Sequence, residues 1–193
     1  MRVWGPGCLR GLPERLCKTA VLDYAGSMTL TSTCGADQTS LSIRQAVPAD
    51  EAFLIALTPR LAAFPLPAWR TADEIARADR GILRDALHGR LEGAAILVAE
   101  LSPGGECAGY VFATTKRDYF TREPHAHVEV LVVEPAAEGC GVARALMAAI
   151  EQWARDGGIG VVTLNVFDRN TRARALYDHL GYARETIHYR KAL

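Results

Sequence analysis

The chain has 193 residues, of which 49% are hydrophobic and 23% are charged, the composition of an ordinary globular protein. Its 22 Lys and Arg residues balance its 22 Asp and Glu residues, so no excess positive charge is present to hold a nucleic acid or an anionic membrane surface. No apolar run reaches the ~18 residues that span a bilayer, and no apolar signal segment follows the basic start, so we expect a cytoplasmic protein.

The five cysteines are scattered and lack the spacing of metal ligands. They are Cys8, Cys17, Cys34, Cys107 and Cys140. This odd, dispersed set predicts free thiols in a reducing compartment and no metal site.

The first 40 residues are rich in Gly, Pro, Ser and Thr and show neither helical nor strand periodicity. We expect residues 1–40 to form an irregular or disordered extension and residues 41–193 to form one domain. Met28 lies inside the extension, which leaves open whether residues 1–27 belong to the native protein or form a short arm.

The domain begins with a short alternating stretch at residues 41–46, which predicts a strand. Pro48 then suits a helix start, and Pro59 predicts a kink or restart of that helix. The segment from Phe64 to Trp69 holds two prolines and cannot be regular helix. Thr71 and Glu74 have the spacing of a capping box and predict the start of a second helix.

From residue 94 the pattern changes to strands, predicted over residues 94–101, 107–115 and 125–133. A helix follows from Val142 to the Gly157–Gly158 pair, and then come a strand over 161–167, a short helix capped by Asn170, and a last strand over 182–189. This order predicts a single-domain α/β fold with a mixed, mostly antiparallel sheet flanked by helices.

The most informative segment joins the strand that ends at Val133 to the next helix through Gly139 and Gly141. Glycines at a helix N-terminus let a ligand approach unpaired backbone N–H groups, where the helix dipole favours a phosphate. A dinucleotide-binding fingerprint is disfavoured because Arg144 stands where its third small residue belongs, and no Walker A ending is present.

Two motifs resemble the GNAT superfamily of acyl-CoA-dependent N-acetyltransferases. The first is the family's [QR]-x-x-G-x-[GA] turn, which is matched at Glu138, Gly141 and Ala143 after a Val-x-Pro element. The second is the downstream N-x-x-A-x-x-x-Y-x-x-x-G-[FY] segment, which runs from Asn170 through Tyr177 to Tyr182. The resemblance covers residues 41 to 193.

This resemblance implies acetyl-CoA as co-substrate, with no metal, in a cleft where the fourth and fifth predicted strands splay apart. The cofactor-binding residues that it implies are Leu131, Val133, Glu138, Gly139, Cys140, Gly141, Val142, Ala143 and Asn170. One departure is Glu138, which replaces the usual Gln or Arg and places a carboxylate beside the pyrophosphate, so we expect weakened affinity.

The acetyl group would pass directly to a primary amine through a tetrahedral intermediate. Because a lysine-like amine has a pKa of about 10.4, a base must remove its proton at neutral pH. Strand alternation places His127 and Glu129 on one face with Leu131 and Val133, toward the acetyl site, so we expect either residue to be this base. Tyr177 resembles the family's acid that protonates the leaving thiolate, and a packed core tyrosine is the alternative.

The acceptor is not readable from these motifs, and the resemblance fits a small-molecule or a peptide amine. The loop from Phe64 to Trp69 forms either a wall of the acceptor pocket or plain packing. A non-catalytic acyl-CoA sensor is the alternative function, although the retention of Tyr177 and Glu129 favours an enzyme. We expect a monomer or a homodimer with neither nucleic acid nor membrane as partner.

Overall fold

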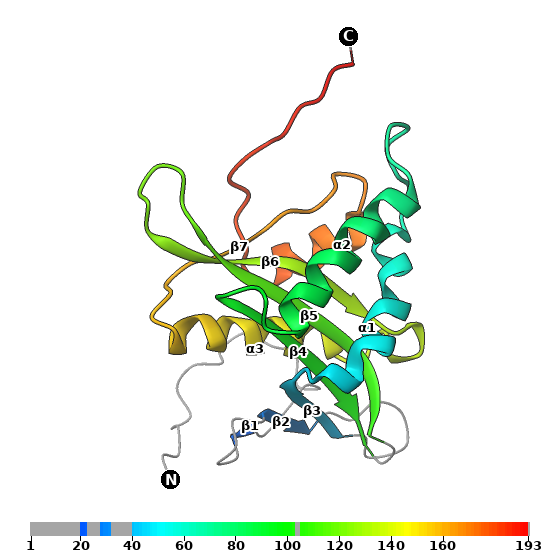
Figure 1. Cartoon of the computed structure of the whole chain (residues 1–193), viewed down its shortest axis with the longest axis vertical. Helices are drawn as coiled ribbons and strands as arrows, with labels where there is room; N and C mark the ends of the chain where they lie inside the picture. Colours follow the sequence, from blue (N-terminus) through cyan, green and yellow to red (C-terminus); the bar gives the residue numbers. More distant parts are fainter. Residues whose placement is uncertain (1–19, 23–27, 32–39, 103–104, 193) are drawn as a thin grey trace.

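A computed structural model of the chain describes residues 20–22, 28–31, 40–102 and 105–192. One sheet of seven strands follows the order of the chain, and all neighbours are antiparallel except β6 and β7, which run parallel (Figure 1). The strands are β1 (Ala20–Leu22), β2 (Met28–Thr31), β3 (Ser40–Gln45), β4 (Ala94–Leu101), β5 (Glu106–Arg117), β6 (Pro124–Val133) and β7 (Val162–Leu164).

Four α-helices and three short 3-10 helices complete the domain. They are η1 (Pro48–Asp50), α1 (Glu51–Leu57), η2 (Thr58–Ala62), α2 (Ala72–Leu87), η3 (Pro135–Ala137), α3 (Val142–Asp156) and α4 (Thr171–His179). The predicted capping box is confirmed, because the Glu74 amide donates to Thr71 Oγ1 at 3.2 Å and the Thr71 amide donates to Glu74 Oε2 at 2.9 Å. Pro59 has the predicted effect, since α1 ends at Leu57 and continues as η2.

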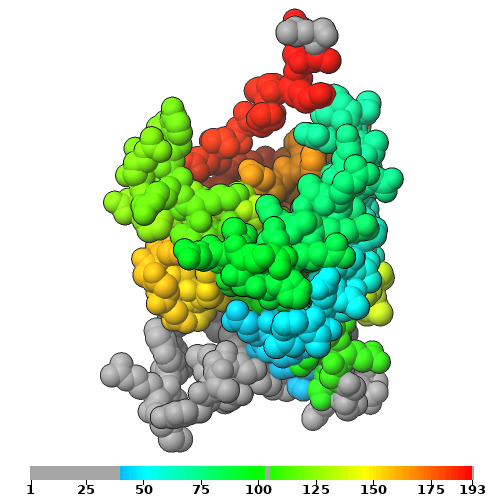
Figure 2. All heavy atoms as spheres, in the orientation of Figure 1, coloured from blue at the N-terminus to red at the C-terminus, as the bar shows by residue number. Residues whose placement is uncertain are grey.

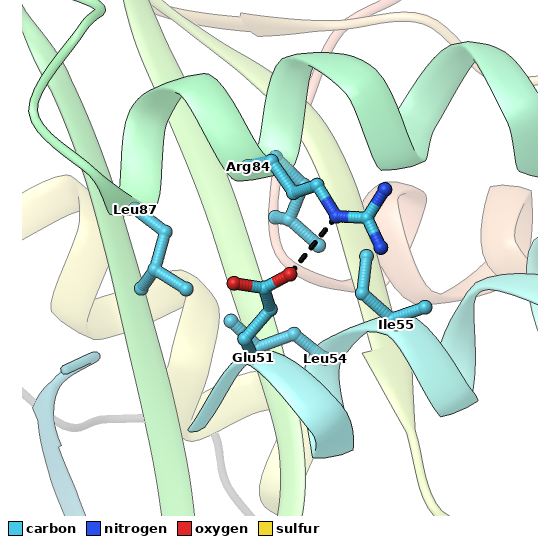
Figure 3. Close-up of a pocket in the computed structure, with 6 residues that line it drawn as sticks. Glu51, Leu54, Ile55, Arg84 and Leu87 are labelled. Atoms are coloured by element: carbon cyan, nitrogen blue, oxygen red, sulfur yellow. Dashed lines mark hydrogen bonds and ion pairs between the residues drawn. The ribbon is translucent and has the colours of Figure 1, made fainter. Parts of the chain in front are cut away.

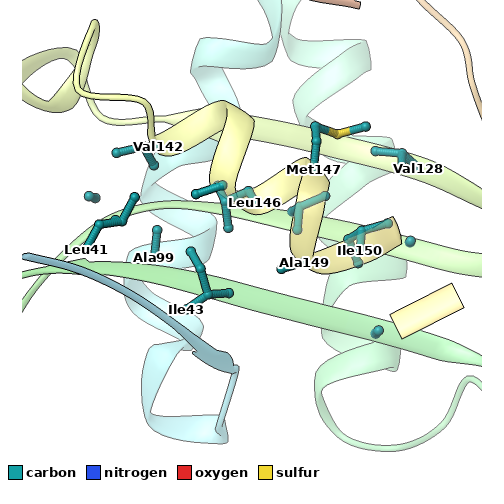
Figure 4. Packing of buried hydrophobic residues seen from close by; sticks show 14 of the residues in the cluster. Leu41, Ile43, Ala99, Val128, Val142, Leu146, Met147, Ala149 and Ile150 are labelled. Carbon is teal, nitrogen blue, oxygen red and sulfur yellow. The ribbon is translucent and has the colours of Figure 1, made fainter. Parts of the chain in front are cut away.

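Helices cover both faces of the sheet, and each face has its own core. On one face α3 packs its buried side chains against β3 to β6, and Figure 4 shows Leu146 and Ile150 in this cluster with Ile43 and Val128. On the other face α1 and α2 cover the side chains of β4, β5 and β6, including the fully buried Tyr110. The α/β class and the mostly antiparallel sheet predicted from the sequence are therefore confirmed.

The N-terminal segment differs from the expectation in its described parts. Residues 20–22 and 28–31 are strands, and β2 pairs with β3 from Met28 to Thr31. The rest of residues 1–39 lies outside the described residues. The short strands escaped the sequence reading because three or four residues are too few to show a period of two.

The strand predicted over 182–189 is wrong. This segment is described, carries no regular secondary structure and is exposed from Ala183 onward. Its alternation of apolar and polar residues is strand-like, but a strand forms only where a neighbouring strand accepts its hydrogen bonds. The strand predicted over 161–167 is also shorter, with only Val162–Leu164 paired to β6.

The prediction of free thiols holds for Cys107 but not for Cys140, which is disulfide-bonded. The spacing of cysteines along a sequence cannot show which of them meet in space, which is why the expectation failed. Cys8, Cys17 and Cys34 lie outside the described residues.

Candidate functional site

The parallel strands β6 and β7 separate soon after they meet. They pair only from Ala126 to Val128 on β6, although β6 continues to Val133. Beyond Val128 the β7-facing edge of β6 has no strand partner among the described residues. This opening confirms the predicted splay between the fourth and fifth predicted strands.

A β-bulge places Glu129 at the start of this opening. On β5, Ala113 and Phe112 pair with Val128 and Val130, which leaves Glu129 as an extra residue. The bulge reverses the alternation of the strand, because Val128 packs in the α3 cluster whereas Val130 packs in the α1–α2 cluster.

The unbroken alternation that we expected along β6 is therefore wrong. Because Val128 lies on the α3 face, its neighbour His127 faces the α1–α2 side, whereas Leu131 and Val133 pack against the α3 cluster. His127 and the two later residues thus lie on opposite faces of the sheet. An inserted residue is the physical reason, and the sequence of alternating letters gives no signal of it.

The Glu129 carboxylate is half-buried, and one of its oxygens has two partners. Its Oε1 accepts the Thr114 hydroxyl at 2.7 Å and pairs with Lys116 Nζ at 2.7 Å. Burial works to raise the pKa of Glu129, but the Lys116 ammonium and the Thr114 hydroxyl outweigh it, and the pKa lies below its usual value. Glu129 is therefore an anion at neutral pH.

His127 bridges the two strands where they begin to part. Its Nδ1 lies 2.7 Å from Thr163 Oγ1, and its Nε2 lies 3.2 Å from Asn165 Nδ2. The Asn165 Nδ2 group donates to Nε2, and Thr163 Oγ1, which donates to the Ala126 carbonyl, accepts from Nδ1, so this arrangement corresponds to the tautomer with the proton on Nδ1. Burial, with the Lys116 charge, lowers the pKa of His127, and the ring is neutral at pH 7.

The turn between β6 and α3 is shaped by two glycines. Gly139 and Gly141 both have φ of +80°, a left-handed conformation that favours glycine, and Gly141 is the N-cap of α3. A Cβ atom built at either glycine would meet no atom within 4 Å, so open space lies in front of both. The first-turn amides of α3, including those of Val142 and Ala143, have no acceptor within the helix.

The Cys140 amide, which we expect to face the phosphate, donates a hydrogen bond within the turn. The Cys140 amide donates to the Ala137 carbonyl at 3.3 Å, in the same way as the Glu138 amide donates to the Pro135 carbonyl. These two bonds form the turn itself. The contact of the Cys140 N–H with a ligand stays a prediction, and the amides at the helix start have no acceptor within the helix.

Two arginines surround the unusual Glu138 side chain. Arg60 Nη2 lies 2.5 Å and Arg172 Nη1 lies 2.7 Å from Glu138 Oε1. Hydrogen bonding to Arg172, together with the charge of Arg60, keeps the pKa of Glu138 below its usual value. The three groups carry a net charge of +1, so the turn does not present an isolated negative charge. No local pattern predicts the contact with Arg60, because this residue lies 78 positions before Glu138.

Helix α4 begins as the sequence predicted and presents Tyr177 to the core. The Asn170 Oδ1 accepts the Ala173 amide at 3.1 Å, which confirms the cap. The Tyr177 ring packs against the α3 cluster and lies 5.9 Å from the Tyr182 ring. Burial raises the pKa of Tyr177 to about 12, so its hydroxyl keeps its proton at neutral pH.

Two residues that the sequence analysis missed are linked electrostatically to Glu129, Asp79 directly and Tyr110 through Asp79. Burial, and then repulsion by Glu129, raises the pKa of Asp79 on α2. The buried Tyr110 hydroxyl has no hydrogen-bond partner among the described residues, and burial with the Asp79 charge raises its pKa. These groups lie far apart in the sequence, and no local pattern could reveal their interaction.

The face of the molecule in Figure 2 is hollowed by a recess. Figure 2 shows it between the hairpin that joins β5 and β6 and the loop before α2, with residues of the α4 region inside it. The loop before α2 contacts the segment after β7, since the rings of Phe64 and Phe167 lie 5.3 Å apart. Phe64 thus packs against the segment that follows β7. The sequence allowed two roles for this loop, a wall of the acceptor pocket or plain packing.

A separate hollow lies between α1 and α2. Figure 3 shows it lined by Leu54, Ile55 and Leu87 and crossed by the ion pair of Arg84 Nε with Glu51 Oε1 at 2.9 Å. Its apolar side chains and ion pair close it, and it lies away from the splay. We assign it to helix packing.

The described residues hold neither a cluster of metal ligands nor a helix that could span a membrane. No group of three or more His, Cys, Asp and Glu side chains there could hold a metal ion. None of the described helices combines the length and apolar character needed to cross a bilayer.

The family model of the acetyltransferase (GNAT) family matches residues 57–182. Aminoglycoside N(6')-acetyltransferase type 1 of Stenotrophomonas maltophilia is 31% identical over 144 residues, which are 73% of this chain and 85% of that protein. A mycothiol acetyltransferase of Salinispora arenicola is 37% identical over 122 residues, which are 62% of this chain but 36% of that longer protein.

Solved structures show the same fold at low sequence identity. An aminoglycoside N-acetyltransferase in complex with CoA superposes with a TM-score of 0.61 at 22% identity, covering 83% of this chain and all of that chain. An acetyltransferase of Trypanosoma brucei gives a TM-score of 0.55 at 22% identity over 79% of this chain and 99% of that chain.

Proposed function

Because the chain belongs to the GNAT family of acetyltransferases, we propose that it transfers an acetyl group from acetyl-CoA directly to a primary amine of a small, cationic acceptor. The observation that carries the proposal is the splay itself: an unpaired strand edge that starts at an ionised Glu129 and leads to a glycine turn with open space in front of it. Related proteins act on amines, as the name of the Stenotrophomonas relative states.

The residues present fit acetyl-CoA. The open space in front of Gly139 and Gly141 leaves room for a pyrophosphate against the helix start, where the Val142 and Ala143 amides and the helix dipole favour an anion. The free edge of β6 near Leu131 and Val133 offers backbone groups to the pantetheine arm, and Asn170 stands at the start of α4. In this arrangement the pyrophosphate lies beside the cluster of Arg60, Glu138 and Arg172, which has a net charge of +1.

The Arg60–Glu138–Arg172 cluster leads to a first prediction. We expect Glu138→Gln to change acetyl-CoA affinity by less than about twofold, because both arginines already offset the carboxylate, and Arg172→Ala to weaken it by up to about fivefold, the range of an exposed ion pair. Isothermal titration of the variants measures both effects, with the exposed Arg169→Ala as control. The Arg172→Ala substitution is also measured in the Glu138→Gln variant. If it lowers acetyl-CoA affinity by the same factor there as in the wild type, Arg172 does not act through Glu138.

Acetyl-CoA supplies an activated thioester. The protein must help to remove a proton from the acceptor amine and to deliver a proton to the leaving thiolate. The ionised Glu129 attracts the acceptor ammonium and accepts its hydrogen bond, and the nitrogen attacks the thioester carbonyl only after a proton has left it. Because its pKa is low, Glu129 is a weak base, so we propose that it passes the proton on to water. His127 positions this region by joining β6 to Thr163 and Asn165. Tyr177, still protonated, donates to the departing thiolate.

The carboxylates beside the splay favour a cationic acceptor. Burial raises the pKa of Asp79, and repulsion by the Glu129 carboxylate adds to this shift. A second positive group on the acceptor would relieve this repulsion. An amino sugar or polyamine with several amines has this chemistry, and the name of the 31% identical relative points to the same class.

The central test is turnover over an amine panel with the Glu129→Gln variant. We expect thiol release with an aminoglycoside or spermidine to exceed that with glucosamine or a short peptide. Glu129→Gln should lower kcat/KM about 100-fold, the lower end for general acid–base catalysis, and leave acetyl-CoA affinity unchanged. The measurement is a free-thiol assay beside calorimetric titration with acetyl-CoA.

Glu123→Gln is the matched control, since Glu123 is an exposed carboxyl in the loop before β6. Full activity of the Glu129 variant would contradict the role of this residue. Binding of acetyl-CoA without turnover of any amine would instead favour a non-catalytic sensor, and binding of ATP or NAD in place of acetyl-CoA would contradict the proposed function.

A further inference from the structure

Asp79 is a carboxylate on the buried side of helix α2. It lies three residues after Ala76 and four residues before Leu83, which are 5% and 1% exposed, so the three side chains share one face of the helix. Asp79 itself is half-buried, and no side chain of the described residues forms a hydrogen bond or an ion pair with it. A carboxylate in this position is unfavourable unless a cation or a hydrogen-bond donor reaches it.

A second group without a partner lies beneath α2. Tyr110 of β5 is fully buried and belongs to the same apolar cluster as Leu83, on the face of the sheet that α2 crosses in Figure 1. Its hydroxyl finds no hydrogen-bond partner in the part of the chain that the structure describes. Burial, together with the charge of Asp79, raises the pKa of Tyr110, so the hydroxyl is protonated and lies within electrostatic reach of that carboxylate. A buried hydroxyl is rarely left unpaired, so Tyr110 marks a position where a ligand can form a hydrogen bond.

Glu129 lies on the same face of the sheet as Tyr110. Side chains alternate along β5, where Tyr110 and Phe112 pack in the α1–α2 cluster, so Thr114 lies on that face as well. The Thr114 hydroxyl donates to Glu129 Oε1 at 2.7 Å and thus draws the carboxylate to this side. Burial, and after it repulsion by Glu129, raises the pKa of Asp79, which agrees with this placement.

The charges on this face do not balance. Lys116 Nζ lies 2.7 Å from Glu129 Oε1 and offsets that carboxylate, whereas Asp79 has no cationic partner among the described residues, so the three side chains carry a net charge of −1. A ligand that completes this face must be positive and must form hydrogen bonds with both a carboxylate and a hydroxyl. A primary ammonium meets both conditions, because it carries one positive charge and three N–H donors.

We propose that Asp79 and Tyr110 form a subsite for a second ammonium of the acceptor, while Glu129 faces the ammonium that is acetylated. This inference rests on the proposed function and adds to it the residues that select the acceptor. The second ammonium donates one hydrogen bond to the Asp79 carboxylate and one to the Tyr110 hydroxyl oxygen, and its charge offsets the repulsion between the two carboxylates. A polyamine or an amino sugar with several amines can occupy both positions at once, whereas a monoamine can occupy only one.

Calorimetric titration of the CoA-bound protein with spermidine and with butylamine measures the subsite without turnover, because CoA carries no acetyl group. We expect spermidine to bind the wild type about 10- to 100-fold more tightly than butylamine, the range of a hydrogen bond to a charged group. Asp79→Asn should lower this ratio of affinities about 10-fold or more, because an amide cannot offset the charge of the ammonium.

Asp73→Asn is the matched control, since Asp73 is an exposed carboxyl in the first turn of the same helix. It removes the same charge from α2 and should keep the wild-type ratio of affinities. A ratio that falls equally in the Asp79 and Asp73 variants would show a general effect of charge and would overturn the subsite. Equal affinity of the wild type for spermidine and butylamine would overturn it as well.

Tyr110→Phe separates binding from packing. The substitution removes a hydroxyl that has no partner to lose among the described residues, so the melting temperature should not fall. The ratio of spermidine to butylamine affinity should fall about three- to tenfold, the range of a single hydrogen bond. Tyr182→Phe is the control, because the Tyr182 hydroxyl donates to Glu151 instead. An unchanged ratio in Tyr110→Phe would overturn the place of this hydroxyl in the subsite.

Thiol release from acetyl-CoA distinguishes this inference from the proposed function. We expect Asp79→Asn to raise KM for spermidine about 10-fold or more with a smaller effect on kcat, because a contact remote from the reacting atoms acts equally on the ground state and the transition state. The same KM for spermidine in the wild type and in Asp79→Asn would overturn the subsite and leave the proposed function intact. Absence of thiol release with every amine would contradict the proposed function, whereas spermidine binding that depends on Asp79 would still support the subsite.

Discussion

Replacing Gly141 with valine is expected to weaken acetyl-CoA binding by more than about 100-fold while the fold persists. Gly141 has φ of +80° and ψ of 1°, and a β-branched residue in this left-handed region costs at least about 1–2 kcal/mol. The new side chain would also enter the open space in front of α3, where we place the pyrophosphate. Calorimetric titration with acetyl-CoA measures the loss.

Gly158 provides the matched control at the opposite end of α3. It has φ of +72°, and a Cβ atom there would likewise meet no atom within 4 Å. Gly158→Val should therefore carry a similar backbone strain and a similar fall in melting temperature, with normal acetyl-CoA affinity. Equal losses of affinity in the two variants would show that strain alone, and not the position of Gly141, accounts for the effect.

The glycine turn was predictable because its physical cause is local. Positive φ at Gly139 and Gly141, the Asn170 cap and the Thr71 capping box each depend on residues within a few positions of one another. The class of the fold followed from the same local patterns, since the order of strands and helices leaves few ways to cover a sheet.

The chemistry of the splay was only partly predictable because it depends on distant contacts. The bulge at Glu129 exists only relative to β5 and turns His127 away from the face of Leu131 and Val133. Arg60 lies 78 residues before Glu138 in the sequence and forms an ion pair with it. The carboxylate that we expected to repel the pyrophosphate is therefore offset by a positive charge. The periodicity of residues along one strand or helix cannot predict either of these contacts.

The predicted strand at residues 182–189 failed for a similar reason. Apolar and polar residues do alternate there, but strand formation requires a partner edge in reach. Within one chain the exit at Tyr182 and the contact of Arg190 with Trp69 lead the segment elsewhere. Alternation of apolar and polar residues is therefore not sufficient for a strand where no partner edge accepts its hydrogen bonds.

Replacing Tyr177 with phenylalanine is expected to lower kcat about 100-fold with little change in acetyl-CoA affinity, since general acid catalysis contributes ~10²–10⁴ in rate. The substitution removes the hydroxyl and keeps the ring that packs against the α3 cluster, so the fold should be retained. Steady-state kinetics with a fixed amine at saturating acetyl-CoA measures the change.

The Tyr182→Phe variant separates proton donation from packing. Tyr182 is the aromatic neighbour of Tyr177, at 5.9 Å between rings, and its hydroxyl donates to Glu151 and not toward the splay. This variant should keep its kcat and lose only stability. Because burial raises the pKa of Tyr177 to about 12, the acid stays protonated throughout the neutral and mildly alkaline range, and the wild-type rate should not fall between pH 7 and pH 10 on account of this group. A Tyr177→Phe enzyme with wild-type kcat would assign this tyrosine to the core alone, and the leaving thiolate would then depart without an acid from the protein.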